Sequence, residues 1–390
     1  MADYSRPQTT ASPKSIPLSE IAYVFLRLGT IAFGGPAAHI AMMEDEIVRK
    51  RAWITQAEFL DRLAAASLIP GPSSTELGIF IGQSKRGWKG LIVAGGCFIV
   101  PAAFVVTLLA AVYVRYGSLP QVAGVLYGIK PAVIAIILQA LWNLSRTAIK
   151  TGPLAAIAIV SIVLNALGVS PLVVLAFAGI SSGVRRWFNR EVAAAFFPGS
   201  PVRLFGWLIA TGAGAAAVPV GMLRLFLSFL KIGAVVFGSG YVLLAFLRAE
   251  FIAHLHWLTE QQLIDAVAVG QFTPGPVFTT ATFIGYLVAG IPGAFLATVA
   301  IFLPGFLLVA ASGSLVSKIR RSATAAAILD GVVAGSLALM AVVAWQLARA
   351  AIVDWRTLLI LCLSTVLILR LRVNSVWVIA GAALAGWLLH

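Results

Sequence analysis

Two Pro-Gly-Pro elements are the most informative places for chemistry in this sequence. Each lies in an apolar stretch and is followed by hydroxyl side chains, in SLIPGPSSTELG and GQFTPGPVFTTATFIG. Proline interrupts a helix, and a helix that restarts after it presents free backbone N–H groups and a positive dipole end. Because amides and hydroxyls together bind oxyanions, we predict an anion site at Pro70, Gly71, Pro72, Ser73, Ser74, Thr75, Pro274, Gly275, Pro276, Thr279 and Thr280. A packing kink with hydroxyl caps is the alternative interpretation.

Two basic residues and two glycine-rich turns are candidates to complete this site. Arg27 and Lys231 lie in otherwise apolar stretches, where a charge costs about 2.5–3.5 kcal/mol on insertion scales. Each could be a countercharge for an anion, or could extend its charged end to the membrane interface. The turns FGGP and FGSG allow the backbone to approach an anion or a neighbouring helix at Gly34, Gly35, Gly238 and Gly240.

The composition places these elements in a lipid bilayer. The 390 residues are 60% apolar and 11% charged, whereas about 25% of a soluble domain is charged. No water-soluble fold hides so much apolar surface, so we expect helices, which satisfy their own backbone hydrogen bonds in lipid. The net charge of +14 comes from short basic clusters between apolar stretches. That pattern is typical of topology signals and not of a nucleic-acid-binding surface.

The chain contains an internal repeat. The segment FLRLGTIAFGG aligns with FLKIGAVVFGS, and the same register aligns Trp53 with Trp257 and the two Pro-Gly-Pro elements with each other. After a one-residue deletion the alignment continues and matches Trp142 with Trp345. Rare residues do not hold one register over so long a stretch by chance, so the chain is a duplicated unit.

We predict an all-α polytopic membrane protein whose two homologous halves form an inverted-topology repeat. About 10–13 membrane segments are expected, including broken helices or re-entrant hairpins. If the N-terminus is cytoplasmic, basic residues gather on the cytoplasmic side only when the second half is inverted, and the C-terminus is then periplasmic. Parallel halves with scattered charges are the alternative. The predicted parts are a tail at 1–17, the N-terminal repeat at 18–190, a linker with an unpaired transmembrane helix at 191–223 and the C-terminal repeat at 224–390.

Few carboxylates lie in apolar surroundings, and each is a candidate for proton coupling because burial favours the protonated form. The repeat partners Asp61 and Asp265 could equally lie on helix surfaces near the interface. Lys130 and Asp330 lie in equivalent stretches of the two halves, and their similar depth suggests an ion pair. The carboxylate candidates are Asp61, Glu76, Asp265 and Asp330.

Motifs for other functions are absent from the sequence. There is no nucleotide-binding GxxxxGK[ST] loop, no Gly-x-Ser-x-Gly element and no HExxH. His254 and His256 would point to opposite sides of a helix, and Cys97 and Cys362 stand alone in apolar stretches, so we predict no metal site, cofactor or disulfide. Transport would therefore use an ion gradient or be passive.

Longer motifs resemble the chromate ion transporter family. FLRLGTIAFGGPAAHI, RKRAW and the first Pro-Gly-Pro element resemble its N-terminal half-signature, and FGSGYVLLAFLRAEF with WLTEQQLIDAVAVGQFTPGP resembles the C-terminal one. The resemblance covers nearly all of the chain from about residue 20. By motif position it adds Gln271 to the site and His39 to both the site and the coupling candidates. This chain departs from the family at two positions where the family often has Gln: Ser67 and Glu76. Glu76 is therefore a feature specific to this chain.

The resemblance implies a long-chain, two-domain member that exports chromate across a bacterial inner membrane. The proton-motive force would drive export, chromate resistance would result, and no catalysis would be involved. The same fold could instead import sulfate or another tetrahedral oxyanion. A different class, a membrane scaffold or enzyme without a solute cargo, is the further alternative. The expected partners are the oxyanion, protons and the lipid bilayer, with no nucleic acid and with a homodimer as one option for assembly.

Overall fold

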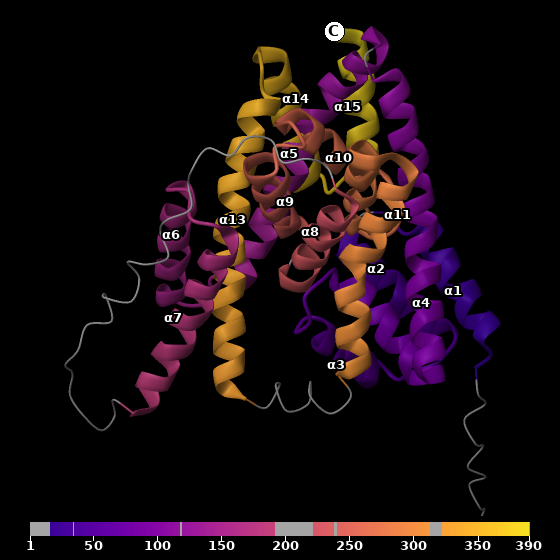
Figure 1. Cartoon of the computed structure of the whole chain (residues 1–390), viewed down its shortest axis with the longest axis vertical. Helices are drawn as coiled ribbons and strands as arrows, with labels where there is room; N and C mark the ends of the chain where they lie inside the picture. The colour runs from indigo at the N-terminus through magenta and orange to yellow at the C-terminus, as the bar shows by residue number, and fades with distance from the viewer. Residues whose placement is uncertain are drawn as a thin grey trace, which may run out of the picture.

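The protein is helical throughout the part of the chain that the structure describes. A computed structural model describes residues 16–33, 35–117, 119–191, 221–237, 240–312 and 322–389 (Figure 1). Within these ranges every regular element is a helix, which confirms the predicted all-α class. Gly34, Gly238 and most of the predicted linker with its unpaired helix lie outside the described residues.

The first half begins with short helices and continues with long ones. The short elements are α1 (Leu18–Ile31), α2 (Gly35–Met43), the π-helical segment η1 (Glu44–Lys50) and α3 (Gln56–Ala66). After the first Pro-Gly-Pro element come α4 (Ser73–Tyr116), α5 (Pro120–Ala148), α6 (Gly152–Ala166) and α7 (Pro171–Glu191).

The second half repeats this order. It contains α8 (Met222–Val235), the 3₁₀ turn η3 (Gly240–Val242), α9 (Leu243–Leu247), the π-helical segment η4 (Arg248–His254) and α10 (Glu260–Phe272). After the second Pro-Gly-Pro element come η5 (Val277–Thr279), α11 (Thr280–Ala311), α13 (Ala323–Ala351), α14 (Trp355–Leu369) and α15 (Ser375–Leu389). The N-terminal caps are also repeated, because α3 and α10 both start with a capping box, at Thr55 and at Thr259.

α4 and α11 are each a helical hairpin with two arms. The backbone leaves the helical region at Arg86 and Gly87 in α4, and at Ala289 and Gly290 in α11. At each hairpin two glycines bring the arms into backbone contact, so that a Cβ built on Gly82 would lie 2.3 Å from the carbonyl oxygen of Gly90. Gly285 and Gly293 repeat this contact in α11. The arms meet this closely because glycine has no Cβ.

The two halves are inverted relative to each other and interlock. In Figure 1 the second arm of α4 rises to the end of the molecule that carries the C-terminus, whereas α11 descends to the opposite end and α13 rises from there. The last helix of each half packs on the long helix of the other, with α7 against α13 and α15 against α5. α4 also packs against α11. One part of the core is therefore built between the halves, and another lies within the first half, between Ile21 and Phe98.

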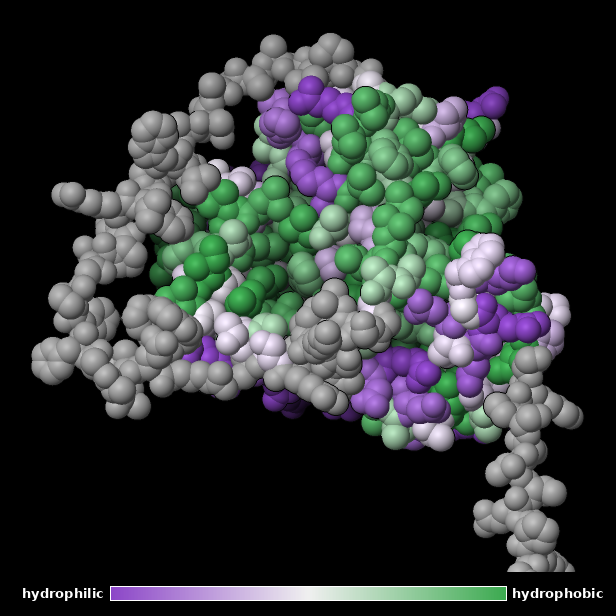
Figure 2. Space-filling view, turned by 60° about the horizontal axis from the view of Figure 1, so that its bottom comes forward, coloured by the Kyte–Doolittle hydropathy of each residue, from purple (hydrophilic) through white to green (hydrophobic). Residues whose placement is uncertain are grey.

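The outer surface is suited to lipid. Among the described residues, four helices are long and apolar enough to cross a membrane: Ser73–Tyr116, Val122–Ala148, Val277–Ala311 and Thr324–Ala351. Figure 2 shows apolar side chains over most of the visible face, with hydrophilic ones gathered near its upper and lower edges. Large apolar side chains such as those of Phe104 and Phe295 are 70% and 71% exposed. A water-soluble protein does not expose apolar surface on this scale, and the chain is a multi-pass membrane protein.

The glycine contact at the hairpin predicts opposite effects for two Gly→Ala substitutions in α4. Gly82→Ala should destabilise the protein by about 1–3 kcal/mol, because its methyl group would overlap the Gly90 carbonyl. Gly96→Ala has no atom within 4 Å of its new methyl group, and should be neutral or stabilising by up to about 1 kcal/mol. Thermal unfolding of the detergent-purified variants measures both. Equal melting temperatures for the two variants would contradict the hairpin contact.

Candidate transport site

Each Pro-Gly-Pro element is held by the other half of the molecule. The amide of Gly71 donates to the carbonyl oxygen of Val236 at 2.8 Å, just after α8. The amide of Gly275 donates to the carbonyl oxygen of Ala32 at 2.9 Å, just after α1. Val236 and Ala32 are the last residues before the turns FGSG and FGGP. The two predicted kinds of glycine break therefore meet in crossed pairs at the interface of the halves.

Glycine is required at the centre of both elements. Gly71 has φ of +128° and Gly275 has φ of +91°, a backbone region that other residues rarely occupy. The space is also filled: a Cβ on Gly71 would lie 2.1 Å from Oε1 of Glu76, and one on Gly275 would lie 2.8 Å from Cβ of Ala102. The flanking prolines end the preceding helix and allow the next to begin at once.

A hydrogen-bond chain through His39 connects the two elements. The carbonyl oxygen of Ala32, which accepts from Gly275, also accepts from Nε2 of His39 at 3.1 Å. Because a carbonyl oxygen only accepts, Nε2 carries a proton, and in the neutral ring Nδ1 accepts from the Ser74 hydroxyl at 3.3 Å. His39 is 1% exposed and packs edge-on against Phe98. The sequence pointed to His39 only through the family motif, and its bond to Ser74 could not be predicted.

The hydroxyl groups that follow the two Pro-Gly-Pro elements differ in their hydrogen bonding. Thr279 and Thr280 are fully buried, and their hydroxyls donate to the carbonyl oxygens of Pro276 and Val277. In the first half Ser73 is half-buried, while Thr75 is buried and its Oγ1 has no hydrogen-bond partner among the described residues. The first half therefore presents its hydroxyls more freely than the second.

Glu76 places a carboxyl group directly beside the first Pro-Gly-Pro element. Its side chain is 1% exposed and lies between two glycines, with Oε1 close to the Cβ positions of Gly71 and Gly305. Within the described residues Oε2 has no hydrogen-bond partner. A buried ionised carboxylate without a partner is very costly, so this group is suited to carry a proton.

Tyr241 is a site residue that sequence reasoning missed. Its hydroxyl donates to Oε1 of Gln271 at 3.1 Å and lies 3.9 Å from the position of a Cβ on Gly35. Tyr241 therefore joins the glycine break of the first half to Gln271, three residues before the second Pro-Gly-Pro element. Nε2 of the buried Gln271 has no partner among the described residues. The tyrosine that directly follows FGSG, next to Gly240, was the available signal.

Arg27 and Lys231 are bound to carboxylates. Arg27 forms an ion pair with Glu46 at 3.4 Å, and Lys231 pairs with Glu250, the repeat partner of Glu46. The two basic side chains are 46% and 43% exposed. In this conformation their charges are compensated within their own halves, as expected for side chains that extend toward an interface.

The carboxylates of the two halves have different environments. Asp61 is exposed, whereas Asp265 is buried and accepts from the Tyr113 hydroxyl at 2.9 Å. The predicted Lys130–Asp330 ion pair is wrong: Lys130 lies 3.4 Å from Asp265, and Asp330 pairs with Lys150 at 2.7 Å. Because the halves are inverted, equivalent positions of α5 and α13 lie toward opposite ends of the molecule, and Lys130 and Asp330 therefore find different partners.

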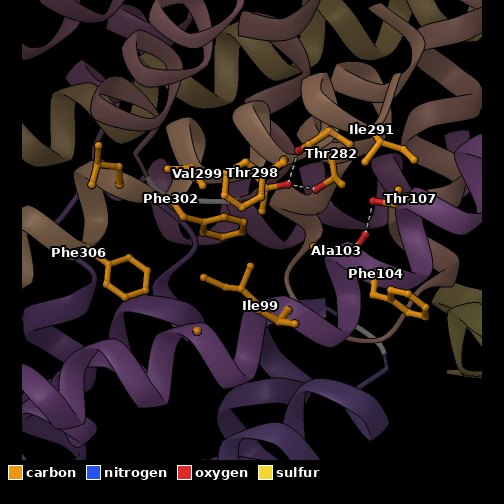
Figure 3. Close-up of a pocket in the computed structure, with 15 residues that line it drawn as sticks. Ile99, Ala103, Phe104, Thr107, Thr282, Ile291, Thr298, Val299, Phe302 and Phe306 are labelled. Atoms are coloured by element: carbon orange, nitrogen blue, oxygen red, sulfur yellow. Dashed lines mark hydrogen bonds between the residues drawn. The ribbon is translucent and has the colours of Figure 1, made fainter. Parts of the chain in front are cut away.

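An apolar groove of about 520 Å³ lies between α4 and α11 (Figure 3). Its lining is apolar apart from three threonines, and two of these, Thr282 and Thr298, bond to each other at 2.7 Å. With its hydroxyls already paired and no charged side chain among the residues that line it, the groove does not suit an oxyanion. The polar cluster at the Pro-Gly-Pro elements is the better candidate.

The fold and the crossed breaks define a membrane protein of two inverted repeats with a polar cluster at their interface. A family model described as chromate transporter matches residues 19–183 and 223–387, one match for each half. The chain belongs to the chromate transporter family. No solved structure matches it.

Curated relatives of full length carry related names. A chromate transport protein of Cupriavidus metallidurans is 33% identical, over 97% of this chain and 96% of the relative. A probable chromate transport protein of Synechococcus elongatus is 33% identical, over 83% of each chain. A chromate transport protein of Pseudomonas aeruginosa is 29% identical, over 97% of this chain and 94% of the relative.

The packing at the second Pro-Gly-Pro element predicts a larger effect for Gly275→Ala than for Gly168→Ala. Both glycines have positive φ, so each substitution should cost about 1–2 kcal/mol of backbone strain. At Gly275 the methyl group also meets Ala102, which adds about 1–3 kcal/mol, whereas Gly168 has no atom within 4 Å. Thermal unfolding of the purified variants measures the difference, and equal losses would contradict the close packing described here.

Proposed function

We propose that the protein exports chromate, a tetrahedral oxyanion, and binds it between the two Pro-Gly-Pro elements. The observation that carries this proposal is the crossed pair of hydrogen bonds, from Gly71 to Val236 and from Gly275 to Ala32. Broken helices that meet between inverted repeats are a common plan for the substrate site of a secondary transporter. The names of the full-length relatives support chromate as the cargo.

The polar atoms near the breaks support an oxyanion as ligand. The Thr75 hydroxyl and the Gln271 amide are buried donors without partners in the described structure, and such groups are rare in folded proteins unless they serve a function. The first arm of α4 starts at Ser73, two residues before Thr75, and adds the positive end of its helix dipole. In the proposed bound state these donors surround the oxyanion, without needing Arg27 or Lys231 to leave their carboxylates.

Glu76 is the proposed carrier of a coupling proton. It is the buried carboxyl next to Gly71, and it has a free oxygen atom in the described structure. An ionised Glu76 would repel a dianion bound a few ångströms away, whereas a protonated one would not. Exchange of a proton for chromate at this position would couple export to the proton-motive force. We place the protein in a bacterial inner membrane, with a cytoplasmic N-terminus and a periplasmic C-terminus.

The function is tested by chromate accumulation in cells that express the wild type or Thr75→Val. Wild-type cells should accumulate less chromate than control cells, and an uncoupler should remove the difference. Loss of one hydrogen bond to a charged ligand, about 1.5–3 kcal/mol, should weaken the apparent affinity about tenfold or more in Thr75→Val. Thr107→Val is the matched control, because the Thr107 hydroxyl in the second arm of α4 bonds to its own helix.

Three other outcomes would contradict parts of this proposal. Higher accumulation in wild-type cells, suppressed by sulfate, would identify an oxyanion importer. Equal loss in Thr75→Val and Thr107→Val would remove Thr75 from the site. No effect of a well-expressed wild type would remove chromate as the cargo.

The coupling role predicts that Glu76→Gln separates transport from the proton gradient. In proteoliposomes loaded with chromate, a pH gradient should accelerate wild-type flux, whereas flux through Glu76→Gln should not respond to it. Glu44→Gln is the control, because Glu44 pairs with Arg49 at the surface. A Glu76→Gln protein whose flux still follows the pH gradient would exclude Glu76 as the proton carrier.

A further inference from the structure

A second polar cluster lies away from the Pro-Gly-Pro elements, where α4, α5, α10 and the end of α13 meet. It lines a pocket of about 430 Å³ whose polar side chains are Tyr113, Tyr127, Lys130, Gln261 and Asp265. In Figure 1 these helices come together in the upper part of the molecule, toward the C-terminus. Since one water takes up about 30 Å³ in the liquid, the pocket has room for an oxyanion with several waters.

The donors of this pocket converge on a single carboxylate. The Tyr113 hydroxyl donates a hydrogen bond to Oδ2 of Asp265 at 2.9 Å. Oδ1 of Asp265 forms an ion pair with Nζ of Lys130 at 3.4 Å. Lys130 also donates to Oε1 of Gln261 at 2.7 Å, and the Gln261 amide donates to the carbonyl oxygen of Ala350. The Lys130 side chain is 19% exposed and that of Asp265 is 3% exposed. The cation is thus reachable from the pocket, while its partner is buried behind it.

The duplicated fold does not require this cluster. In the aligned register Ala57 occupies the position of Gln261, and Val333 occupies the position of Lys130. Asp61, the repeat partner of Asp265, is exposed. A structural device of the repeat would be expected in both halves, as the Arg27–Glu46 and Lys231–Glu250 pairs are. The cluster is therefore specific to one end of the molecule.

The cluster also lies in line with the proposed transport site. Asp265 and Gln271 are both on α10, and at 1.5 Å per residue they are about 9 Å apart along the helix axis. Gln271 is the residue with an unpartnered amide beside the second Pro-Gly-Pro element. An ion that entered or left at this end would pass the Lys130 pocket shortly before or after the central site.

We propose that this pocket is a second oxyanion subsite, in which Lys130 is the cation and Asp265 is a built-in competitor. The Asp265 carboxylate holds the ammonium and the phenol in the place of a substrate oxyanion. An arriving dianion then exchanges with Asp265 for these donors, which keeps binding weak enough for release. The inference rests on the proposed oxyanion transport and adds a specific residue, Lys130, to the route.

The alternative is that Lys130–Asp265 is only a contact between the halves that must break when the protein opens. The two interpretations predict different directions for the effects of Lys130→Gln and Asp265→Asn on oxyanion binding. For a contact, Lys130→Gln and Asp265→Asn both remove the same ion pair and should act in the same direction. For a subsite with a competitor, Lys130→Gln should weaken oxyanion binding, whereas Asp265→Asn should strengthen it because the ammonium is released.

The test is a local binding measurement with sulfate, a redox-stable tetrahedral dianion. Val353 lines the pocket and is 67% exposed, so an environment-sensitive fluorophore on Val353→Cys, with Cys97 and Cys362 replaced by Ala, reports on this pocket. Sulfate is titrated into the detergent-purified protein without any gradient. We expect Lys130→Gln to weaken the sulfate affinity at least about tenfold, and Asp265→Asn to tighten it severalfold.

Arg115→Gln is the matched control. It removes one positive charge from α4 two residues beyond Tyr113, but Arg115 does not line the pocket and stacks on Tyr116. Its sulfate affinity should stay within about twofold of the parent, because exposed charges in water interact weakly. A tenfold loss in Arg115→Gln would indicate attraction by general charge and would overturn the subsite.

The remaining outcomes also decide the inference. Shifts of Lys130→Gln and Asp265→Asn in the same direction, or a fluorophore that does not respond to sulfate, would overturn the subsite. Chromate export by wild-type cells is measured separately. Normal export with a failed sign test rejects the subsite alone, whereas absent export rejects the proposed function.

Discussion

The arrangement of this protein depends on backbone hydrogen bonds that cross between its halves. A helix that breaks within a membrane exposes amides and carbonyls that lipid cannot satisfy. Here Gly71 and Gly275 each donate to the carbonyl of a residue at the end of a helix in the opposite half, Val236 and Ala32. Neither half can complete its own break, so the polar site forms only where the two inverted units meet. Helices of the two halves also interlock in pairs, α5 with α15 and α7 with α13.

The backbone keeps the symmetry of the duplication, while the side chains of the proposed site depart from it. Glu76 corresponds in the aligned register to Thr280, and His39 corresponds to Leu243. Beside the breaks, the first half thus supplies the Glu76 carboxyl and the His39 imidazole, and the second half supplies the amide of Gln271. In the proposed transport cycle, the symmetric frame gives two equivalent ways to open the site, and the asymmetric side chains make the two directions of transport unequal.

In the described part of the chain, the repeated basic side chains are paired with carboxylates. The repeated basic residues, Arg27 and Lys231, are compensated by the repeated glutamates, Glu46 and Glu250. Near the breaks, polar atoms without charge predominate, including the Thr75 hydroxyl and the Gln271 amide. In the proposed oxyanion site, neutral donors favour release, because a full positive charge in low dielectric would bind a dianion too tightly.

The sequence by itself determined the all-helical membrane class, the duplication and the positions of the Pro-Gly-Pro breaks, and its basic residues favoured inverted halves over parallel ones. Lipid leaves few options for the backbone, and each Pro-Gly-Pro element combines two prolines with a glycine at positive φ, which ends one helix and starts the next. Only the tertiary structure decided which groups meet. Tyr241 reaches Gln271, and Lys130 pairs with Asp265 instead of Asp330. Such pairings depend on how helices rotate and cross between the halves, which periodicity and repeat register do not specify.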